Sequence, residues 1–213
     1  METTGLTRAR ARDGLLARTG GADGNERLTA ATGAVLLVLL AIEGVTILFL
    51  RPLLSVHIFV GILLIPPVAV KLGTVGYRFG RYYSGSRPYR IKGPPHLFMR
   101  VLVAPVLVFS TIGLFATGVA LIVLGPSRGI VLGLHKASFA VWFIAMSVHV
   151  LAYVLRIPGL VRADWTRPGR ENGGYLRSAL LAGSLVLGLT LAVFTLHSAG
   201  PWLHWVQTFH GDH

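Results

Sequence analysis

The sequence predicts an all-α integral membrane protein, a helical bundle with five transmembrane helices. The 213 residues are 53% hydrophobic and only 13% charged, with a mean hydropathy of +0.66, which is too apolar for an ordinary soluble domain. Five apolar stretches each have the roughly 17–25 residues that a helix needs to cross the hydrocarbon core. Basic residues gather in alternate connections between these stretches, as multi-pass proteins require.

The first two stretches lie close together in the chain. The first spans residues 28–50, is interrupted only by Glu43, and is closed by Arg51-Pro52. The second spans residues 53–72 and contains Pro66-Pro67. Two consecutive prolines remove two backbone donors, so we expect a kink in this helix.

The remaining stretches span residues 97–124, 129–156 and 178–197. A turn at Gly125-Pro126-Ser127 separates the third from the fourth. The five stretches form one transmembrane domain over residues 28–197. It follows a polar, disordered cytoplasmic arm over residues 1–27 and precedes an extracytoplasmic tail over residues 198–213.

The basic residues orient the bundle. With the N-terminus inside, the cytoplasmic segments 1–31, 71–100 and 156–177 hold 5, 7 and 5 Lys/Arg, and the outside holds the remaining 3. This bias predicts an N-in, C-out topology. The net charge of +12 is then explained by basic residues that contact anionic lipid on the cytoplasmic face of the bilayer. It does not require that the protein bind nucleic acid. The absence of cysteine excludes thiolate metal sites and Cys nucleophiles.

The fourth stretch carries His135 and His149, fourteen residues apart. This spacing places both imidazoles on one helix face, about 21 Å apart along the axis. Ionisable residues inside a span are costly and mark candidate functional sites. Because haem iron takes axial histidines, two histidines at different depths suggest an electron path through the membrane.

His57 is the natural partner of His135. Both lie a few residues into their spans, and the second and fourth spans run in the same direction. The two histidines therefore sit at similar depth in the outer half of the membrane. Two parallel helices that each offer one histidine at equal depth can grip a haem between them, with one nitrogen on each side of the iron.

Three kinds of neighbour support this outer site. Gly61 follows His57 by four residues, on the same face, where it leaves room for the haem ring. Arg51, Arg128 and Lys136 are the outside cations and are placed to balance haem propionates, although ordinary interfacial snorkelling also explains them. Four roles remain possible for Glu43: it could relay protons, bind a quinone hydroxyl, pair with Arg51, or form a structural hydrogen bond inside the bundle.

The inner half has no equally clear pair. The residue that matches His149 on the second span is Lys71, which is not a usual axial haem ligand. His96, just ahead of the third span, is the other inner histidine. The residues therefore leave open whether the protein binds one haem or two. His149 could share a second haem with His96, face a quinone or water, or form a structural hydrogen bond.

This pattern resembles the membrane cytochrome b superfamily, which includes di-haem b subunits and ferric-reductase-like transmembrane domains. The segments HIFVGILLIPPVAVKL, RYYSGSRPYRIKGPP and LHKASFAVWFIAMSVHV look like small actinobacterial proteins of the cytochrome b/b6-domain kind. The resemblance covers about residues 30–160. It implies His57, His135 and His149 as ligand positions, and Lys71 departs from the four-ligand pattern.

The resemblance also implies a function. A bundle of this kind binds haem b in the bacterial plasma membrane and passes electrons between a quinone pool or cytoplasmic donor and an extracytoplasmic oxidoreductase, a molybdenum enzyme among the candidates. It acts as an electron-transfer subunit more than as a stand-alone enzyme, and no flavin or nicotinamide motif is present. The alternative is a cofactor-free small transporter or a membrane anchor subunit.

Overall fold

A computed structural model describes residues 21–91, 97–125, 129–153, 174–197, 200–202 and 204. Within these ranges, five helices are long and apolar enough to cross a membrane. They are α2 (Gly21–Leu48), α3 (Leu50–Tyr83), α5 (Ala104–Leu124) with the π-helical turn η1 (Met99–Val103) before it, α6 (Gly129–Tyr153) and α8 (Gly174–Leu196). The prediction of an all-helical chain with five helices that could span a membrane is confirmed for the described residues.

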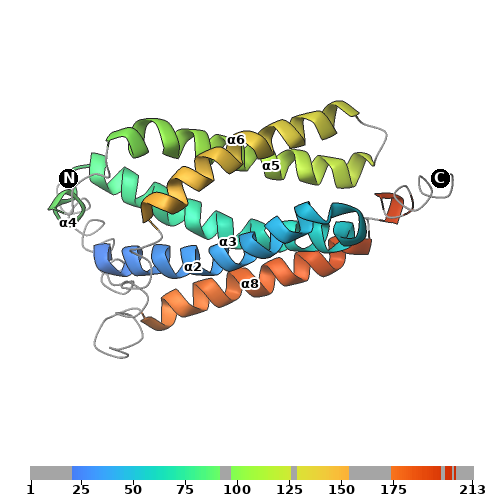
Figure 1. The fold of residues 1–213 in the computed structure, drawn as a ribbon. Coiled ribbons are helices and arrows are strands. Elements are labelled where there is room, and N and C mark those ends of the chain that lie inside the picture. Colours follow the sequence, from blue (N-terminus) through green and yellow to red (C-terminus); the bar gives the residue numbers. More distant parts are fainter. Residues whose placement is uncertain are drawn as a thin grey trace, which may run out of the picture.

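The helices form two groups that lie on opposite sides of one gap (Figure 1). In the first group α3 packs against both α2 and α8, and in the second α5 packs against α6. Successive helices run in opposite directions (Figure 1). As a result α3 and α6 are parallel and begin at the same end of the bundle.

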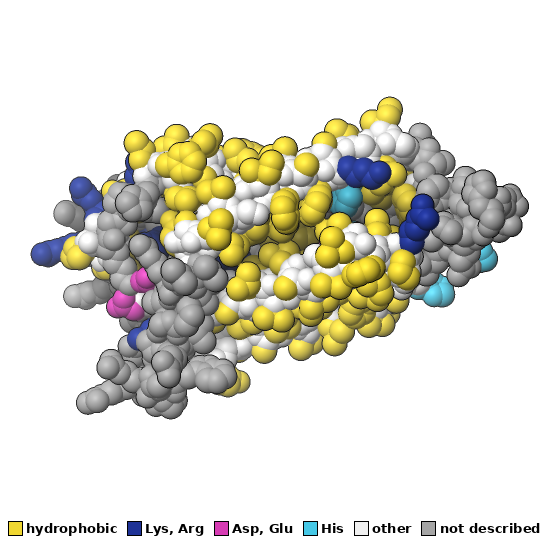
Figure 2. Space-filling view, viewed as in Figure 1, with side chains coloured by type: hydrophobic (Ala, Val, Ile, Leu, Met, Phe, Trp, Pro, Cys, Tyr) yellow, Lys and Arg dark blue, Asp and Glu magenta, His cyan; other side chains and the backbone are white. Residues whose placement is uncertain are grey.

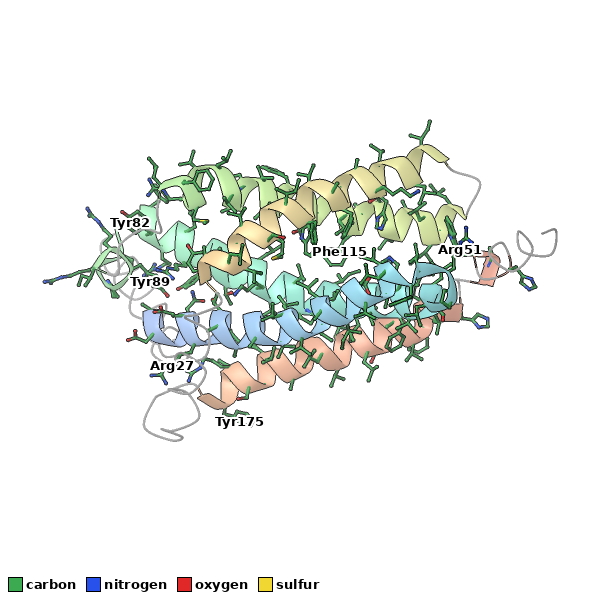
Figure 3. The ribbon with its side chains drawn as sticks, viewed as in Figure 1. Arg27, Arg51, Tyr82, Tyr89, Phe115 and Tyr175 are labelled. Carbon is green, nitrogen blue, oxygen red and sulfur yellow. The ribbon has the colours of Figure 1, made fainter. Side chains whose placement is uncertain are left out.

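The first group has the tightest packing in the molecule. Leu36, Val60 and Leu64 form its buried core, and Phe115 of α5 packs against them from the second group (Figure 3). Gly188 of α8 lies directly against the backbone carbonyl of Leu63, with no room for a Cβ atom. Close backbone approach at a small residue is the usual basis of helix association in lipid.

The connection between α2 and α3 is a single residue, Phe49, with φ −121° and ψ 45°. The irregularity of α3 lies at Leu53, with φ −108° and ψ 16°, so the regular part of the helix begins near the start predicted from the sequence. The expected kink at Pro66-Pro67 is not where α3 departs from helical dihedrals. Both prolines are buried in the first group, where packing keeps the helix continuous across them.

The third span accommodates its proline in a different way. Pro105 lies at the first positions of α5, and the amide of Ala104 donates to the carbonyl of Met99 in the π-helical turn. A wider turn at this point suits a residue that has no N–H to donate. The span ends at Gly125, whose φ of +74° favours glycine.

Two helices extend further than the apolar stretches alone predicted. The first helix begins at Gly21, inside the predicted arm, and the second continues to Tyr83, into the predicted connection. The second helix passes through Gly73, Gly76 and Gly80, and the chain turns only at Gly85, which has φ +80°. The short helix α4 (Arg87–Ile91) follows, and its buried Tyr89 meets Tyr77 edge-on with 6.0 Å between ring centroids.

The two groups of helices touch sparingly. Between the groups, α3 meets α5, whereas α3 and α6 do not pack along their lengths. Figure 2 shows a hollow between the groups, bordered by hydrophobic side chains, with a histidine side chain beside a basic one. At the end where α5 and α8 finish, the indole N–H of Trp202 donates to the carbonyl of Leu121 over 2.7 Å and ties the groups together.

We expect Gly188→Ala to destabilise the bundle by about 1–3 kcal/mol, because its methyl group collides with the Leu63 carbonyl and must push α8 away from α3. Thermal unfolding of detergent-purified protein measures the effect. Gly183→Ala is the matched control on the same helix, since its new methyl group would meet nothing within 4 Å. Equal stability of the two variants would contradict the packing described.

Candidate functional site

His57 lies near the start of α3, where its imidazole meets two side chains of α2. Its Nδ1 is 2.9 Å from Oε1 of Glu43 and 3.1 Å from Oγ1 of Thr46. The side chains of His57 and Glu43 are only 23% and 13% exposed. A carboxylate oxygen only accepts hydrogen bonds, which assigns the imidazole proton to Nδ1 and leaves Nε2 with a free lone pair.

Thr46 holds this arrangement in place. Its hydroxyl donates to the carbonyl of Glu43, one turn earlier, over 2.6 Å, and lies 3.3 Å from Oε2 of the same residue. The Thr46 side chain is 2% exposed. Because its own proton is used within α2, the hydroxyl oxygen is available to accept from the Nδ1–H of His57.

His135 has the same kind of support from α5. Its Nδ1 is 3.1 Å from Oγ1 of Thr117, and that hydroxyl donates to the carbonyls of Gly113 over 2.6 Å and Leu114 over 3.1 Å. The imidazole packs over Gly118, where a Cβ atom would lie 3.2 Å from Cε1. His135 is therefore also held through Nδ1.

The two histidines come from the parallel helices α3 and α6 on either side of the gap. Their side chains lie within electrostatic range of each other. Both imidazoles are half-buried. The structure thus brings together the pair that the sequence matched by depth.

A second pair of polar groups meets at the other depth. The ammonium of Lys71 on α3 lies within electrostatic range of His149 on α6. The sequence matches these two positions by spacing, but it did not predict that they interact. The Nζ of Lys71 donates to the carbonyl of Thr29 over 2.6 Å. Gly33 makes room for it, since a Cβ atom there would lie 2.9 Å from Nζ. The ring of His149 stands 5.1 Å from that of Tyr153, centroid to centroid.

The other predicted site residues are distributed around the outer pair. Gly61 borders the carboxylate of Glu43, with 3.5 Å between a built Cβ and Oε1, so it leaves room for this carboxylate. Arg51 (Figure 3) and Lys136 are exposed near the starts of α3 and α6, the helices that carry His57 and His135. His96, the proposed inner ligand, lies outside the described residues.

The sequence pattern does not single out two threonines of the site, Thr46 and Thr117. Their placement gives a signal that was available: Thr46 stands one helical turn after Glu43 and faces the same way. The structural role expected for Glu43, a carboxylate that points into the bundle and bonds Thr or His, is what the contacts show.

The chemistry of the outer pair suits a haem iron. Among the described residues, no three His, Cys, Asp or Glu side chains gather around one point, whereas haem asks for only two axial nitrogens from the protein. Metal-bound histidines usually donate their second N–H to a carboxylate, hydroxyl or carbonyl, which fixes the tautomer. His57 and His135 both meet this condition, so the residues present fit the group.

Comparison with protein-family models, with curated proteins and with solved structures finds no match to this chain. Function is therefore inferred from the residues and geometry of the site itself.

We expect Thr46→Val to destabilise the protein by about 1–3 kcal/mol, because it removes a buried hydroxyl that serves both α2 and His57. Thermal unfolding in detergent tests this. Thr190→Val is the control, since this exposed hydroxyl bonds only the carbonyl one turn earlier on its own helix. Similar losses in the two variants would show that Thr46 does no more than close a helical turn.

Proposed function

We propose that this chain is a membrane-bound b-type cytochrome that holds one haem b between His57 and His135. A single observation carries the proposal. Two half-buried histidines lie on parallel helices that do not pack along each other, and each is held through Nδ1 by side chains of the preceding helix. A histidine buried only for structure has no need of this matched arrangement on both sides.

The residues have separate tasks in this proposal. His57 and His135 offer Nε2 as axial ligands, and Glu43, Thr46 and Thr117 fix the two imidazole rings. The exposed cations Arg51 and Lys136 stand at the same end and suit the propionate carboxylates. Haem b bound there supplies a one-electron couple. The apolar helices around it exclude water and ions.

The inner half favours one haem over two. Lys71 occupies the position of a fourth ligand, and its ammonium is engaged with the carbonyl of Thr29 in α2. With a single haem near the outer face, electrons would be exchanged there with a quinone or with an extracytoplasmic oxidoreductase, including the molybdenum enzymes. The distribution of basic residues supports an N-in, C-out orientation, and the resemblance suggests the bacterial plasma membrane.

A cofactor-free transporter is the second candidate. Glu43 and Lys71 are polar groups inside spans, and such groups commonly line a substrate path. The third candidate is a membrane anchor subunit. In that case the protein would still bind its partner without His57 and His135. Both alternatives predict colourless protein when the chain is purified from a haem-replete host.

We expect the purified protein to contain one haem b per chain by pyridine haemochrome assay, with a reduced-minus-oxidised spectrum of bis-histidine type. His57→Ala and His135→Ala should each abolish this haem, because each removes an axial ligand. His204→Ala, which changes an exposed histidine near the C-terminal end of the described chain, should leave the haem content unchanged.

The outcomes separate the candidates. Haem-free wild-type protein would end the cytochrome proposal and favour the transporter or the anchor. Full haem content in His57→Ala or His135→Ala would show that the pairing is wrong. Two haems per chain, one of them lost in His149→Ala, would restore a second site in the inner half.

A further inference from the structure

The two candidate ligands have supports that are alike in one respect. In each case a threonine on the preceding helix donates to a carbonyl of its own helix and places its oxygen 3.1 Å from Nδ1 of the histidine. Thr46 does this for His57, and Thr117 does it for His135. The helix pairs α2–α3 and α5–α6 therefore present their histidines through the same device.

Glu43 breaks this equivalence. Its Oε1 lies 2.9 Å from Nδ1 of His57, which is closer than the threonine oxygen. On α5 the residue in the corresponding place, three before Thr117, is the apolar Leu114. His57 is thus supported by a carboxylate and a hydroxyl, whereas His135 is supported by a hydroxyl and by the uncharged backbone of Leu114.

We propose that Glu43 is a positioning residue that makes His57 the stronger electron donor of the two axial ligands and lowers the midpoint potential of the haem. The inference rests on the proposed cytochrome function and deepens it. A carboxylate that accepts the Nδ1–H of a ligating imidazole increases the basicity of Nε2. More electron density at the iron favours the oxidised state, and hydrogen bonds around axial ligands are a recognised means of setting potential.

The surroundings strengthen the effect. Glu43 is mostly shielded from solvent, and Thr46 beside it is buried. In such a low-dielectric setting a hydrogen bond between an imidazole and a carboxylate is stronger than in water. Gly61 leaves the carboxylate enough room to keep this position. The contact is therefore placed where its electronic influence on His57 is largest.

The test is a redox titration of the haem α-band in the full-length, haem-loaded protein purified in detergent. Glu43→Gln keeps the size of the side chain and removes its charge. We expect its midpoint potential to rise, so that reduction becomes roughly tenfold more favourable than in the wild type. Glu43→Asp, which keeps a carboxylate with a shorter reach, should fall between the two. Glu26→Gln, at the opposite end of the same helix, should match the wild type.

A purely structural role for Glu43 gives different results. If Glu43→Gln lowers haem content but the haem-loaded fraction keeps the wild-type potential, the proposal is overturned while the cytochrome function stands. The same holds if Glu43→Gln does not fold and Glu43→Asp, fully loaded, shows the wild-type potential. The electron paramagnetic resonance spectrum of the oxidised protein provides a second reading, since a change in donor strength of His57 must shift its g values.

Discussion

The hydrogen-bonding needs of polar groups inside a hydrocarbon environment govern this structure. Each threonine in the candidate site returns its own proton to a carbonyl of its helix, over 2.6 Å in both Thr46 and Thr117. This local bond leaves one oxygen lone pair that can serve a neighbouring helix. The two histidines are oriented by these oxygens, so the site depends on bonds that first satisfy the membrane helices themselves.

The division into two groups of helices creates the gap on either side of which the two histidines lie. The first group is held by apolar packing around Leu64 and by the close approach of α8 to α3 at Gly188. The second group is held by small residues, with Gly113 against Ser138 and Gly118 against His135. Because each group is packed within itself, the gap between α3 and α6 can remain without collapse of the bundle.

The sequence was sufficient to predict the five helices, because apolar length alone identifies a membrane span. It also matched His57 with His135 by depth, since equal spacing on two parallel helices fixes relative depth, but it did not predict that Lys71 lies near His149. Helix ends were less predictable. The apolar stretch ends at residue 72, but α3 continues to Tyr83 through a segment of arginines and tyrosines, which are compatible with a helix outside the hydrocarbon core. Thr46 and Thr117 were not found, because threonines are common in membrane helices and the rotation of neighbouring helices decides which ones reach an imidazole.

The bond between Trp202 and Leu121 has a consequence for biogenesis. Trp202 follows all five spans in the chain, yet its indole is what joins the end of the first group of helices to the end of α5. During synthesis the pairs α2–α3 and α5–α6 are therefore both inserted before this tie can form. The bond between the two groups of helices can therefore form only after the last of the five spans has been made.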